Sequence, residues 1–252
     1  MTHILYTGSK LGASLIEEVS PVIRLTHLPA LTISHLDLGA HKTLRATLDG
    51  PAPCALVLYS RHAVASLASA NLPLTAVRHV FCVGEKTARL AIDEIATLHP
   101  EQVSHPEKEE EHFQGLVTHI QNHSAVQRGQ LACLVGLGLE GQPRPLDEAL
   151  RGRVPHILLV DAYRSAPTPG FSKALASCCE AETSRPDVIA FASPRAVEAA
   201  AQTLLTLTTP PRCTAIGPTT RDALLTSGLP VLHTATTARV RTLVLESHEA
   251  LR

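Results

Sequence analysis

Four short segments of the sequence combine a serine or glycine with nearby basic side chains, a pattern suited to binding anions. They are Ser60–Arg61–His62, Gly84–Glu85–Lys86–Thr87, Ser193–Pro194–Arg195 and Gly217–Pro218–Thr219–Thr220. Each follows an apolar run and precedes a stretch of helical length. A helix N-terminus offers unpaired backbone N–H groups and the positive end of the helix dipole to a carboxylate or phosphate. We therefore predict anion binding at these turns, helped by the basic residues on or beside them: Arg61, Lys86, Arg89, Arg195 and Arg221.

The same residue types also have a local structural role. A serine at a strand-to-helix junction caps the first helical turn, and Pro194 and Pro218 suit the first helical position, where no N–H is needed. Gly84 and Gly217 let the backbone approach a ligand closely. For any single Ser or Thr, capping explains the residue as well as ligand contact does, but four such turns together favour a ligand site.

A glycine-rich segment, Gly136–Leu137–Gly138–Leu139–Glu140–Gly141, has the spacing of a dinucleotide-binding fingerprint, and Asp161 follows further along the chain. The fingerprint requires a helix that begins directly after the glycines. Here Gln142–Pro143–Arg144–Pro145 follows instead. We interpret the segment as a glycine-rich connection after a strand, with nucleotide binding as the alternative.

Other cofactor and metal motifs are absent from the sequence. There is no Walker loop, HExxH motif or nucleophilic triad, and the six cysteines form no CxxC pair or zinc spacing, which indicates reduced structural thiols. His105 and His112 flank the acidic run Glu107–Glu111. A metal site there is conceivable, but we interpret the run as the solvated first turn of a helix, where negative charge suits the dipole.

The elements that must position these turns follow from the hydrophobic pattern. Apolar runs alternate with helical stretches along almost the whole chain, which predicts parallel sheets in an open α/β fold. The predicted strands are His3–Thr7, Val22–Thr26, Ala55–Tyr59, Val80–Val83, Gln102–His105, Leu131–Val135, His156–Val160, Val188–Ala192, Cys213–Ile216 and Val231–His233. The predicted helices are Ala63–Ala70, Lys86–Ile95, Glu110–Gln121, Pro145–Arg151, Phe171–Glu180, Pro194–Leu205, Thr219–Thr226 and Ala238–Glu249.

Two segments rich in Pro and Gly, Leu28–Pro53 and Ala162–Gly170, interrupt the alternation and predict connections between domains. We expect two similar open parallel-sheet (flavodoxin-like) domains joined by a two-segment linker, the first domain being discontinuous. Residues 1–34 and 166–252 would form the first domain and residues 35–165 the inserted second domain. The linker segments would lie near residues 34–53 and 162–169.

An internal repeat supports the two-domain prediction. The segment Leu56–Leu90 resembles Ile189–Ala223, which lies 133 positions later, without a gap. In open α/β sheets the turns after the strands gather at one edge, the usual ligand site. If the two copies face each other, the four turns line a cleft suited to a large polyanion. The matched pairs are Ser60 and Ser193, Ala63 and Ala196, Val64 and Val197, Gly84 and Gly217, and Thr87 and Thr220.

The composition limits the classes of function. The hydrophobic fraction is 44% and the charged fraction 18%, as in a globular protein with a core, and the formal net charge is −1. A chain without a strong positive balance gives no general attraction for nucleic acid or an anionic membrane. The N-terminus reads as a first strand and not as a signal peptide, and no apolar stretch is long enough to span a membrane. We expect a cytoplasmic protein with neither nucleic acid nor membrane as a partner.

Taken in order, these motifs resemble those of the uroporphyrinogen-III synthase family over nearly the full length. The most recognisable is Ala215–Thr220, followed by Ala223, Leu224 and Gly228. Tyr163–Arg164–Ser165, with Pro169 and Gly170 after it, is similar to the linker that carries the family's most important tyrosine. The remaining matches are Phe191–Val197, Val83–Ala88 and Ser60–Val64.

The resemblance implies a lyase of haem biosynthesis that needs neither cofactor nor metal. Such an enzyme converts hydroxymethylbilane, a linear carboxylate-rich tetrapyrrole, into cyclic uroporphyrinogen III with loss of water and inversion of the terminal ring. Tyr163 would be the catalytic acid. We take the chain to act as a monomer and consider transient contact with the preceding pathway enzyme. The implied substrate-binding residues are Ser60, Gly84, Lys86, Thr87, Ser193, Arg195, Gly217, Pro218, Thr219 and Thr220.

Two positions depart from the family pattern. Gly8 follows Thr7 where the family often has an arginine, and Gly136–Leu137–Gly138 replaces an Arg–Gly pair, a loss for which Arg144 could compensate. Two other classes of function remain as alternatives. One is a non-enzymatic two-domain binder of an anionic small molecule. The other is a tetrapyrrole methyltransferase or nucleotide-dependent enzyme that uses the Gly136–Gly141 segment.

Overall fold

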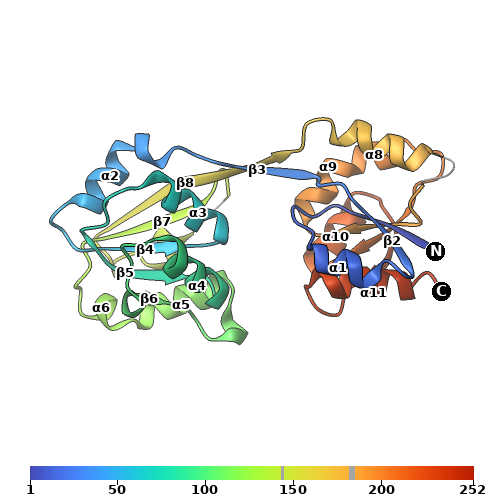
Figure 1. Cartoon of the computed structure of the whole chain (residues 1–252). Helices are drawn as coiled ribbons and strands as arrows, with labels where there is room; N and C mark the ends of the chain where they lie inside the picture. The colour runs from blue at the N-terminus through green and yellow to red at the C-terminus, as the bar shows by residue number, and fades with distance from the viewer. Residues whose placement is uncertain (143–144, 182–184) are drawn as a thin grey trace. The chain divides into compact units, whose positions relative to one another are not determined.

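One parallel sheet holds the N-terminal strands together with the C-terminal half of the chain (Figure 1). The computed structural model describes residues 1–142, 145–181 and 185–252. The strand order in this sheet is β11-β10-β9-β1-β2, and every neighbouring pair is parallel. The strands are β1 (Thr2–Tyr6), β2 (Ile23–His27), β9 (Val188–Phe191), β10 (Arg212–Ala215) and β11 (Val231–Thr234). The helices packed on it are α1 (Ala13–Val19), α8 (Phe171–Glu180), α9 (Pro194–Leu205), α10 (Pro218–Thr226) and α11 (Val240–Glu249).

A second sheet is formed by the middle of the chain, in the order β3-β8-β7-β4-β5-β6. The pairs from β8 to β6 are parallel. The strands are β3 (Leu31–His35), β4 (Cys54–Leu58), β5 (Val77–Cys82), β6 (Val103–Ser104), β7 (Cys133–Leu139) and β8 (His156–Pro167). The helices are α2 (Lys42–Asp49), α3 (Arg61–Ala70), α4 (Glu85–Glu94), α5 (Phe113–Asn122), α6 (Ser124–Gln127) and α7 (Leu146–Ala149), with 3₁₀ turns η1 (Leu38–Ala40), η2 (Pro100–Gln102) and η3 (Lys108–Glu110).

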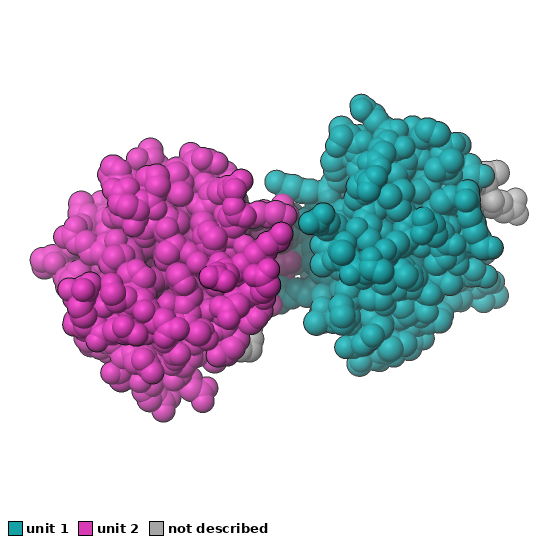
Figure 2. All heavy atoms as spheres, turned by 90° about the horizontal axis from the view of Figure 1, so that it is seen from below, with its two compact units in different colours: residues 1–32, 166–252 teal, residues 33–165 magenta. Residues whose placement is uncertain are grey.

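The two sheets define two compact units (Figure 2). Unit 1 contains residues Met1–Thr32 and Ala166–Arg252, and unit 2 contains Ile33–Ser165. The sequence analysis placed the corresponding divisions after residues 34 and 165. Both divisions fall inside strands, one in β3 and one in β8, and these two strands are neighbours in the second sheet.

Five strands of each unit lie in the same spatial order, but the chain passes through them in a different sequence. Counted along the chain, the strands of unit 1 lie in the order 2-1-3-4-5 of flavodoxin-like folds. In unit 2 the order β8-β7-β4-β5-β6 is the same arrangement if β7 and β8 take the places of β1 and β2. The inserted unit is therefore a circularly permuted counterpart of the other, and the prediction of two similar α/β domains is confirmed.

Each sheet is covered by helices on both faces, and alternate residues of a strand pack against opposite helical layers. In β4, Leu56 and Leu58 pack with α2, α3 and α4, whereas Ala55 and Val57 pack with α5, α6 and α7. In β9, the residues at 189 and 191 pack with α8, α9 and α10, and those at 188 and 190 with α1 and α11. Side chains on a strand alternate between faces, so uniformly apolar strands predict a sheet covered on both sides.

The internal repeat corresponds to equivalent structure. The segment β4–α3–β5–α4 matches β9–α9–β10–α10, with α3 and α9 beginning at residues 61 and 194, and α4 and α10 at residues 85 and 218. These starts are separated by the same interval as the matched sequence pairs. The repeat is thus two copies of one β–α–β–α unit, as predicted.

The sequence pattern missed regular structure in both segments that were predicted as connections between domains. The segment Leu28–Pro53 contains β3, η1 and α2. Leu44 and Leu48 of α2 are fully buried, and Pro and Gly at its ends obscured this short helix. The predicted connection at Ala162–Gly170 largely belongs to β8, which runs to Pro167.

The acidic run Glu107–Glu111 was also misassigned, since it precedes α5 instead of forming its first turn. The helix begins at Phe113, and the imidazole of His112 caps it by accepting from the backbone N–H of Gly115 at 3.1 Å. The carboxylate of Glu111 contacts another helix, as described below. No helix among the described residues is long and apolar enough to cross a membrane.

Glu246 on α11 anchors the loop after β11 through its carboxylate. Its carboxylate accepts from the hydroxyl of Thr236 at 2.5 Å and from the backbone N–H of Thr236 at 2.9 Å, and it lies 2.9 Å from Nε2 of His233. These hydrogen bonds, the Thr236 hydroxyl first, lower the pKa of Glu246 from 4.5 to about 2. A carboxyl whose pKa is lower in the folded state stabilises the fold above its unfolded pKa, and this stabilisation is lost as the pH falls.

Glu246→Gln should therefore lower the melting temperature at neutral pH, and the difference from the parent should shrink as the pH falls from about 4.5 towards 2. Circular dichroism melts across this range measure it. Glu249→Gln on the same helix is the control, because the Glu249 side chain has no hydrogen-bond or ion-pair partner in the described part of the chain. Melting curves that differ by the same amount at every pH would contradict the assignment.

Candidate active site

The four predicted turns lie at the carboxyl edges of the sheets, two in each unit. In unit 2, Leu58 is paired with Cys82, so the turns at Ser60 and Gly84 lie level on neighbouring strands. In unit 1, Phe191 is paired with Ala215, so Ser193 and Gly217 are level in the same way. Parallel strands end at one edge, which brings turns far apart in sequence side by side.

Ser60 and Ser193 occupy the position within each sheet that most favours ligand binding. The strand order changes direction between β7 and β4 in unit 2 and between β1 and β9 in unit 1. Ligands of open α/β sheets bind outside the carboxyl ends of the strands at this point. Both serines are extended, with φ of −166° and −165°, and each side chain caps its helix by accepting a backbone N–H at 3.3 Å, from Ala63 and Ala196 respectively.

Tyr163 lies beside Ser60. It is on β8, it is 8% exposed, and its phenol oxygen accepts a hydrogen bond from the Ser60 hydroxyl at 3.0 Å. The imidazole of His62, in the first turn of α3, lies against the phenol ring with 5.3 Å between ring centroids. The predicted catalytic tyrosine and one predicted binding serine thus form one contact at the switch point of unit 2.

Glu140 and Arg164 fix the backbone next to Tyr163. The backbone N–H of Glu140 donates to the carbonyl of Tyr163 at 2.9 Å. Arg164 forms a two-pronged ion pair with the Glu140 carboxylate, with N–O distances of 2.5 and 2.7 Å. Arg164 lowers the pKa of Glu140, mainly through its hydrogen bonds. The end of β7 is therefore joined to β8 directly beside the tyrosine.

The two glycine turns differ in what occupies them. Both Gly84 and Gly217 are extended N-caps without a side chain of their own. At Gly84, the carboxylate of Glu111 accepts from the backbone N–H of Glu85 at 2.7 Å, and a Cβ on Gly84 would lie 2.7 Å from the Glu111 carboxyl carbon. At Gly217 nothing lies within 4 Å of the corresponding point. One turn already binds an internal carboxylate, and the other is open.

The basic residues near the turns divide into paired and unpaired groups. Arg89 pairs with Glu85, and Arg221 pairs with Asp222 at 2.8 Å. Lys86 is exposed and Arg195 half-buried, and neither has a hydrogen-bond or ion-pair partner among the described residues. These two, which the sequence analysis named as substrate anchors, remain available to an anionic ligand.

The predicted threonines differ in accessibility. Thr219 is exposed, whereas Thr220 is 1% exposed and its repeat partner Thr87 is 8% exposed. Pro218, at the first position of α10, has no N–H, so the donors at this end of the helix come from the residues around it. A ligand in the Gly217 turn can reach the hydroxyl of Thr219 directly.

The interpretation of Gly136–Gly141 as a connection was wrong, and the structure also contradicts the dinucleotide fingerprint. Gly136 and Gly138 lie within β7, which continues to Leu139, and no helix begins at the glycines. A Cβ on Gly136 would lie 2.9 Å from Leu159 and 3.0 Å from the phenol oxygen of Tyr59. The glycine is explained by close packing over the sheet and not by an approaching pyrophosphate.

The departure at Gly8 also has a structural explanation. Its carbonyl oxygen lies 2.7 Å from Nε2 of His27, and Tyr6 stacks on His27. A Cβ at residue 8 would lie 2.0 Å from the Tyr6 phenol oxygen, so an arginine there would require the Tyr6 side chain to move. The suggested substitute for the other departure, Arg144, lies outside the described residues.

Histidines gather around Phe81 on the face of the unit 2 sheet that α5, α6 and α7 cover. His79, His119 and His123 pack around Phe81, and burial lowers the pKa of each imidazole. Nδ1 of His105 lies 2.7 Å from the carbonyl oxygen of Pro106. Within the described residues, no group of three or more His, Cys, Asp or Glu is arranged to hold a metal ion.

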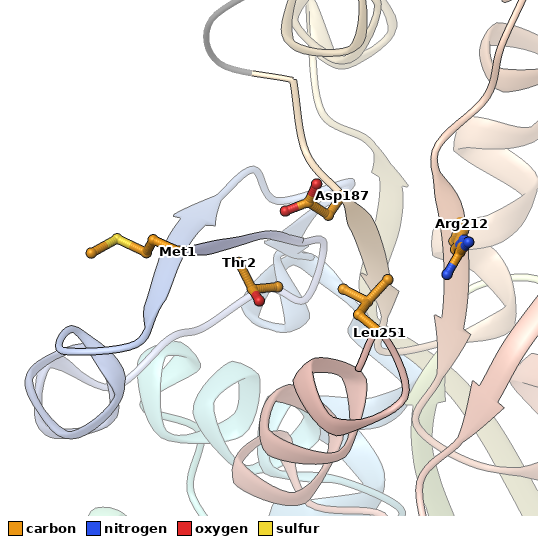
Figure 3. Close-up of a pocket in the computed structure, with 5 residues that line it drawn as sticks. All are labelled: Met1, Thr2, Asp187, Arg212 and Leu251. Atoms are coloured by element: carbon orange, nitrogen blue, oxygen red, sulfur yellow. The ribbon is translucent and has the colours of Figure 1, made fainter.

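A surface cavity of 480 Å³ lies in unit 1 at the amino edge of the sheet (Figure 3). It is lined by Met1, Thr2, Asp187, Arg212 and Leu251, which lie at the starts of β1, β9 and β10 and at the C-terminus. Ligand sites of parallel sheets are formed at the carboxyl edge. This cavity is at the other edge and does not include any predicted site residue.

Similarity to known proteins identifies the family. The sequence matches the family described as Uroporphyrinogen-III synthase HemD over residues 20–244. The chain belongs to the uroporphyrinogen-III synthase family. Members of this family are enzymes of tetrapyrrole biosynthesis, so the predicted family and its place in haem biosynthesis are confirmed. No curated protein sequence matches the chain.

Two solved structures of uroporphyrinogen-III synthases share the fold. The enzyme from Helicobacter pylori has a TM-score of 0.64 at 17% identity and covers 100% of both chains. A mutant enzyme from the extremely thermophilic bacterium Thermus thermophilus has a TM-score of 0.61 at 20% identity and covers 100% of this chain and 99% of its own. At these identities the likeness establishes the fold.

Sequence reasoning missed several residues around the turns. Glu111 was placed in a helix, although its carboxylate binds the first amide of α4. His62 was noted only as part of a turn, and the Glu140–Arg164 ion pair was not predicted. These contacts join residues that are distant in sequence, so no local sequence pattern could predict them.

The glycine turns give a matched test of the Glu111 contact. Gly84→Ala and Gly217→Ala should both lose a little stability, because alanine is a poor N-cap. Gly84→Ala should lose about 1 kcal/mol more, since only there does the new methyl group displace a hydrogen-bonded carboxylate. Urea unfolding measures the difference. In a Glu111→Ala background the two substitutions should cost the same, and an unchanged gap there would rule out Glu111 as its cause.

Proposed function

We propose that this chain is a uroporphyrinogen-III synthase, a cyclising lyase that converts hydroxymethylbilane into uroporphyrinogen III. The observation that carries the proposal is the Tyr163 phenol, held on the Ser60 hydroxyl at the switch point of its sheet in a chain of this family. Two open α/β units, each with helix N-termini at its carboxyl edge, suit a substrate that carries many carboxylates.

The first chemical step would be loss of the terminal hydroxyl. The C–O bond of the hydroxymethyl group breaks, and the departing oxygen takes the phenol proton of Tyr163 and leaves as water. The pyrrole nitrogen supplies the electron pair that expels the water, so the remaining carbon becomes the electrophilic end of an azafulvenium ion and Tyr163 is left as a phenolate. General acid assistance of this kind accelerates a step by roughly 10²–10⁴-fold, and a phenol 8% exposed is screened from competing water.

The second task is geometric. Ring closure must join the two ends of the tetrapyrrole with the last ring inverted, through a spiro intermediate, although closure without inversion is easier. An enzyme favours the harder closure by holding both ends in the productive orientation. Carboxylates remote from the reacting carbon supply the binding energy.

We assign the binding of the substrate carboxylates to the turns whose hydrogen-bond donors or cationic side chains are available to a ligand. In unit 1 these are Ser193 with Arg195 and the open turn from Gly217 through Pro218, Thr219 and Thr220. In unit 2, Lys86 stands beside the turn of Gly84 and Thr87, where Glu111 already fills one carboxylate position. No cofactor enters the proposed steps, and we expect a cytoplasmic enzyme that acts as a monomer.

Product analysis tests the proposal directly. The purified chain is given hydroxymethylbilane, and the porphyrins formed after oxidation are separated by isomer. We expect predominantly type III product, against type I in the protein-free control. Type I product alone, at the spontaneous rate, would contradict the proposed activity.

Tyr163→Phe tests the acid. The variant keeps the ring and loses only the hydroxyl, so kcat for type III product should fall by about 100-fold or more with little change in KM. Tyr6→Phe, which removes another almost fully buried phenol, is the control for stability. A wild-type rate in Tyr163→Phe would dispose of the catalytic role.

Thr219→Val tests the open turn. Loss of one hydrogen bond to a carboxylate should raise KM by roughly tenfold, because such bonds contribute about 1.5 kcal/mol. Thr226→Val, the same change at the exposed other end of α10, should leave KM unchanged. Equal effects of the two substitutions would argue against binding at the N-terminus of this helix.

A further inference from the structure

The Ser60 hydroxyl takes part in two contacts at once. Its oxygen accepts the backbone N–H of Ala63 at 3.3 Å, which caps α3, and it donates to the phenol oxygen of Tyr163 at 3.0 Å. A hydroxyl has one hydrogen to donate and two lone pairs. The cap uses one lone pair and leaves the hydrogen of Ser60 free to donate, and the structure has it donated to the phenol oxygen.

This direction leaves the hydrogen of Tyr163 free. A phenol also has one hydrogen, and Ser60 supplies a donor and not an acceptor in their contact. The phenol hydrogen is therefore available to another oxygen. When it leaves, the phenol oxygen gains negative charge, and a hydrogen bond already donated to that oxygen becomes charge-assisted and stronger.

We infer that Ser60 is a positioning residue, which aims the Tyr163 proton at the substrate and stabilises the phenolate left behind, instead of binding a substrate carboxylate. The inference rests on the proposed function and assigns a further role within it. His62 contributes to the same arrangement, because its ring packs against the phenol from the first turn of α3. One turn of the chain thus holds both the oxygen and the ring of the tyrosine.

The repeat provides an internal comparison. Ser193 has the same extended conformation and caps its helix at the same distance of 3.3 Å, but it contacts no tyrosine among the described residues. Its hydrogen remains available to a ligand. Both serines therefore cap a helix, but only Ser60 donates to a phenol. If replacing Ser60 has an effect that replacing Ser193 does not have, that difference reports the contact with the phenol.

The first test needs no substrate. The chain has three tyrosines and no tryptophan, so [ζ-¹³C]tyrosine labelling gives few NMR signals, and Tyr163→Phe identifies that of Tyr163. Ser60→Ala should shift this signal and leave those of Tyr6 and Tyr59 in place, whereas Ser193→Ala and Ser60→Thr should not move it. A Tyr163 signal unmoved in Ser60→Ala would overturn the inference, whatever the enzyme assay shows.

The second test is kinetic. Ser60→Ala should lower kcat for type III product by about 10- to 100-fold with KM changed less than about twofold, as expected when a bond to a charged group is lost only in the transition state. Ser60→Thr should restore most of kcat. Ser193→Ala should instead raise KM. If Ser60→Ala raises KM like Ser193→Ala and keeps kcat, Ser60 binds substrate and the inference fails, while the proposed function stands.

Folding is controlled by a further variant. Glycine is an acceptable N-cap, so Ser60→Gly removes the hydroxyl with less damage to α3 than alanine causes. It should show the same shift of the Tyr163 signal and the same loss of kcat. If the wild-type chain itself makes no type III product, the proposed function fails, and the NMR comparison still decides whether Ser60 donates to Tyr163.

Discussion

The candidate site depends on one constraint of parallel sheets, namely that every strand ends at the same edge. A turn that follows one buried strand is therefore level with the turn that follows its neighbour, whatever their separation in sequence. Ser60 and Tyr163 are 103 residues apart and meet in this way. Helices that begin at this edge also direct their free N–H groups towards it. The edge therefore brings together both the side chains of the turns and backbone donors for an anion.

The two units apply this constraint with different connectivity. β7 and β8, at the end of unit 2, take the places that β1 and β2 hold at the start of unit 1. The phenol on β8 reaches the first turn of α3, while the equivalent serine of unit 1 contacts no tyrosine in the described part of the chain. The two copies of the repeated unit thus differ: one has a phenol beside its serine and a carboxylate in its glycine turn, and the other has an open glycine turn.

Much of this arrangement could be predicted from the sequence. Uniformly apolar runs such as Val188–Phe191 are typical of strands covered on both faces, and the phase of Ser60 with Ser193 and of Gly84 with Gly217 revealed the repeat. The first signal is local, and the second comes from comparing two segments of the sequence 133 positions apart. The helix α2 was missed because it is short and bounded by Pro and Gly, and β3 because only two of its five residues are even half-buried.

The errors at the site have a different cause. Gly136 was assigned to a connection because glycine in a sequence marks a turn more often than it marks a crowded strand, and only the side chains of Tyr59 and Leu159 show the crowding. Glu111 was assigned to a helix by charge alone, since its amide partner lies 26 residues away. Contacts of this kind depend on tertiary packing, which the sequence pattern does not specify.

The threading of the chain also separates the order of synthesis from the order of assembly. Unit 2 is one continuous stretch, and its entering and leaving strands are neighbours, so it can complete its sheet as soon as β8 has been made. β1 is central in the other sheet, and its partner β9 begins only at Val188. One side of β1 therefore has no partner strand until all of unit 2 and the start of β9 have been synthesised.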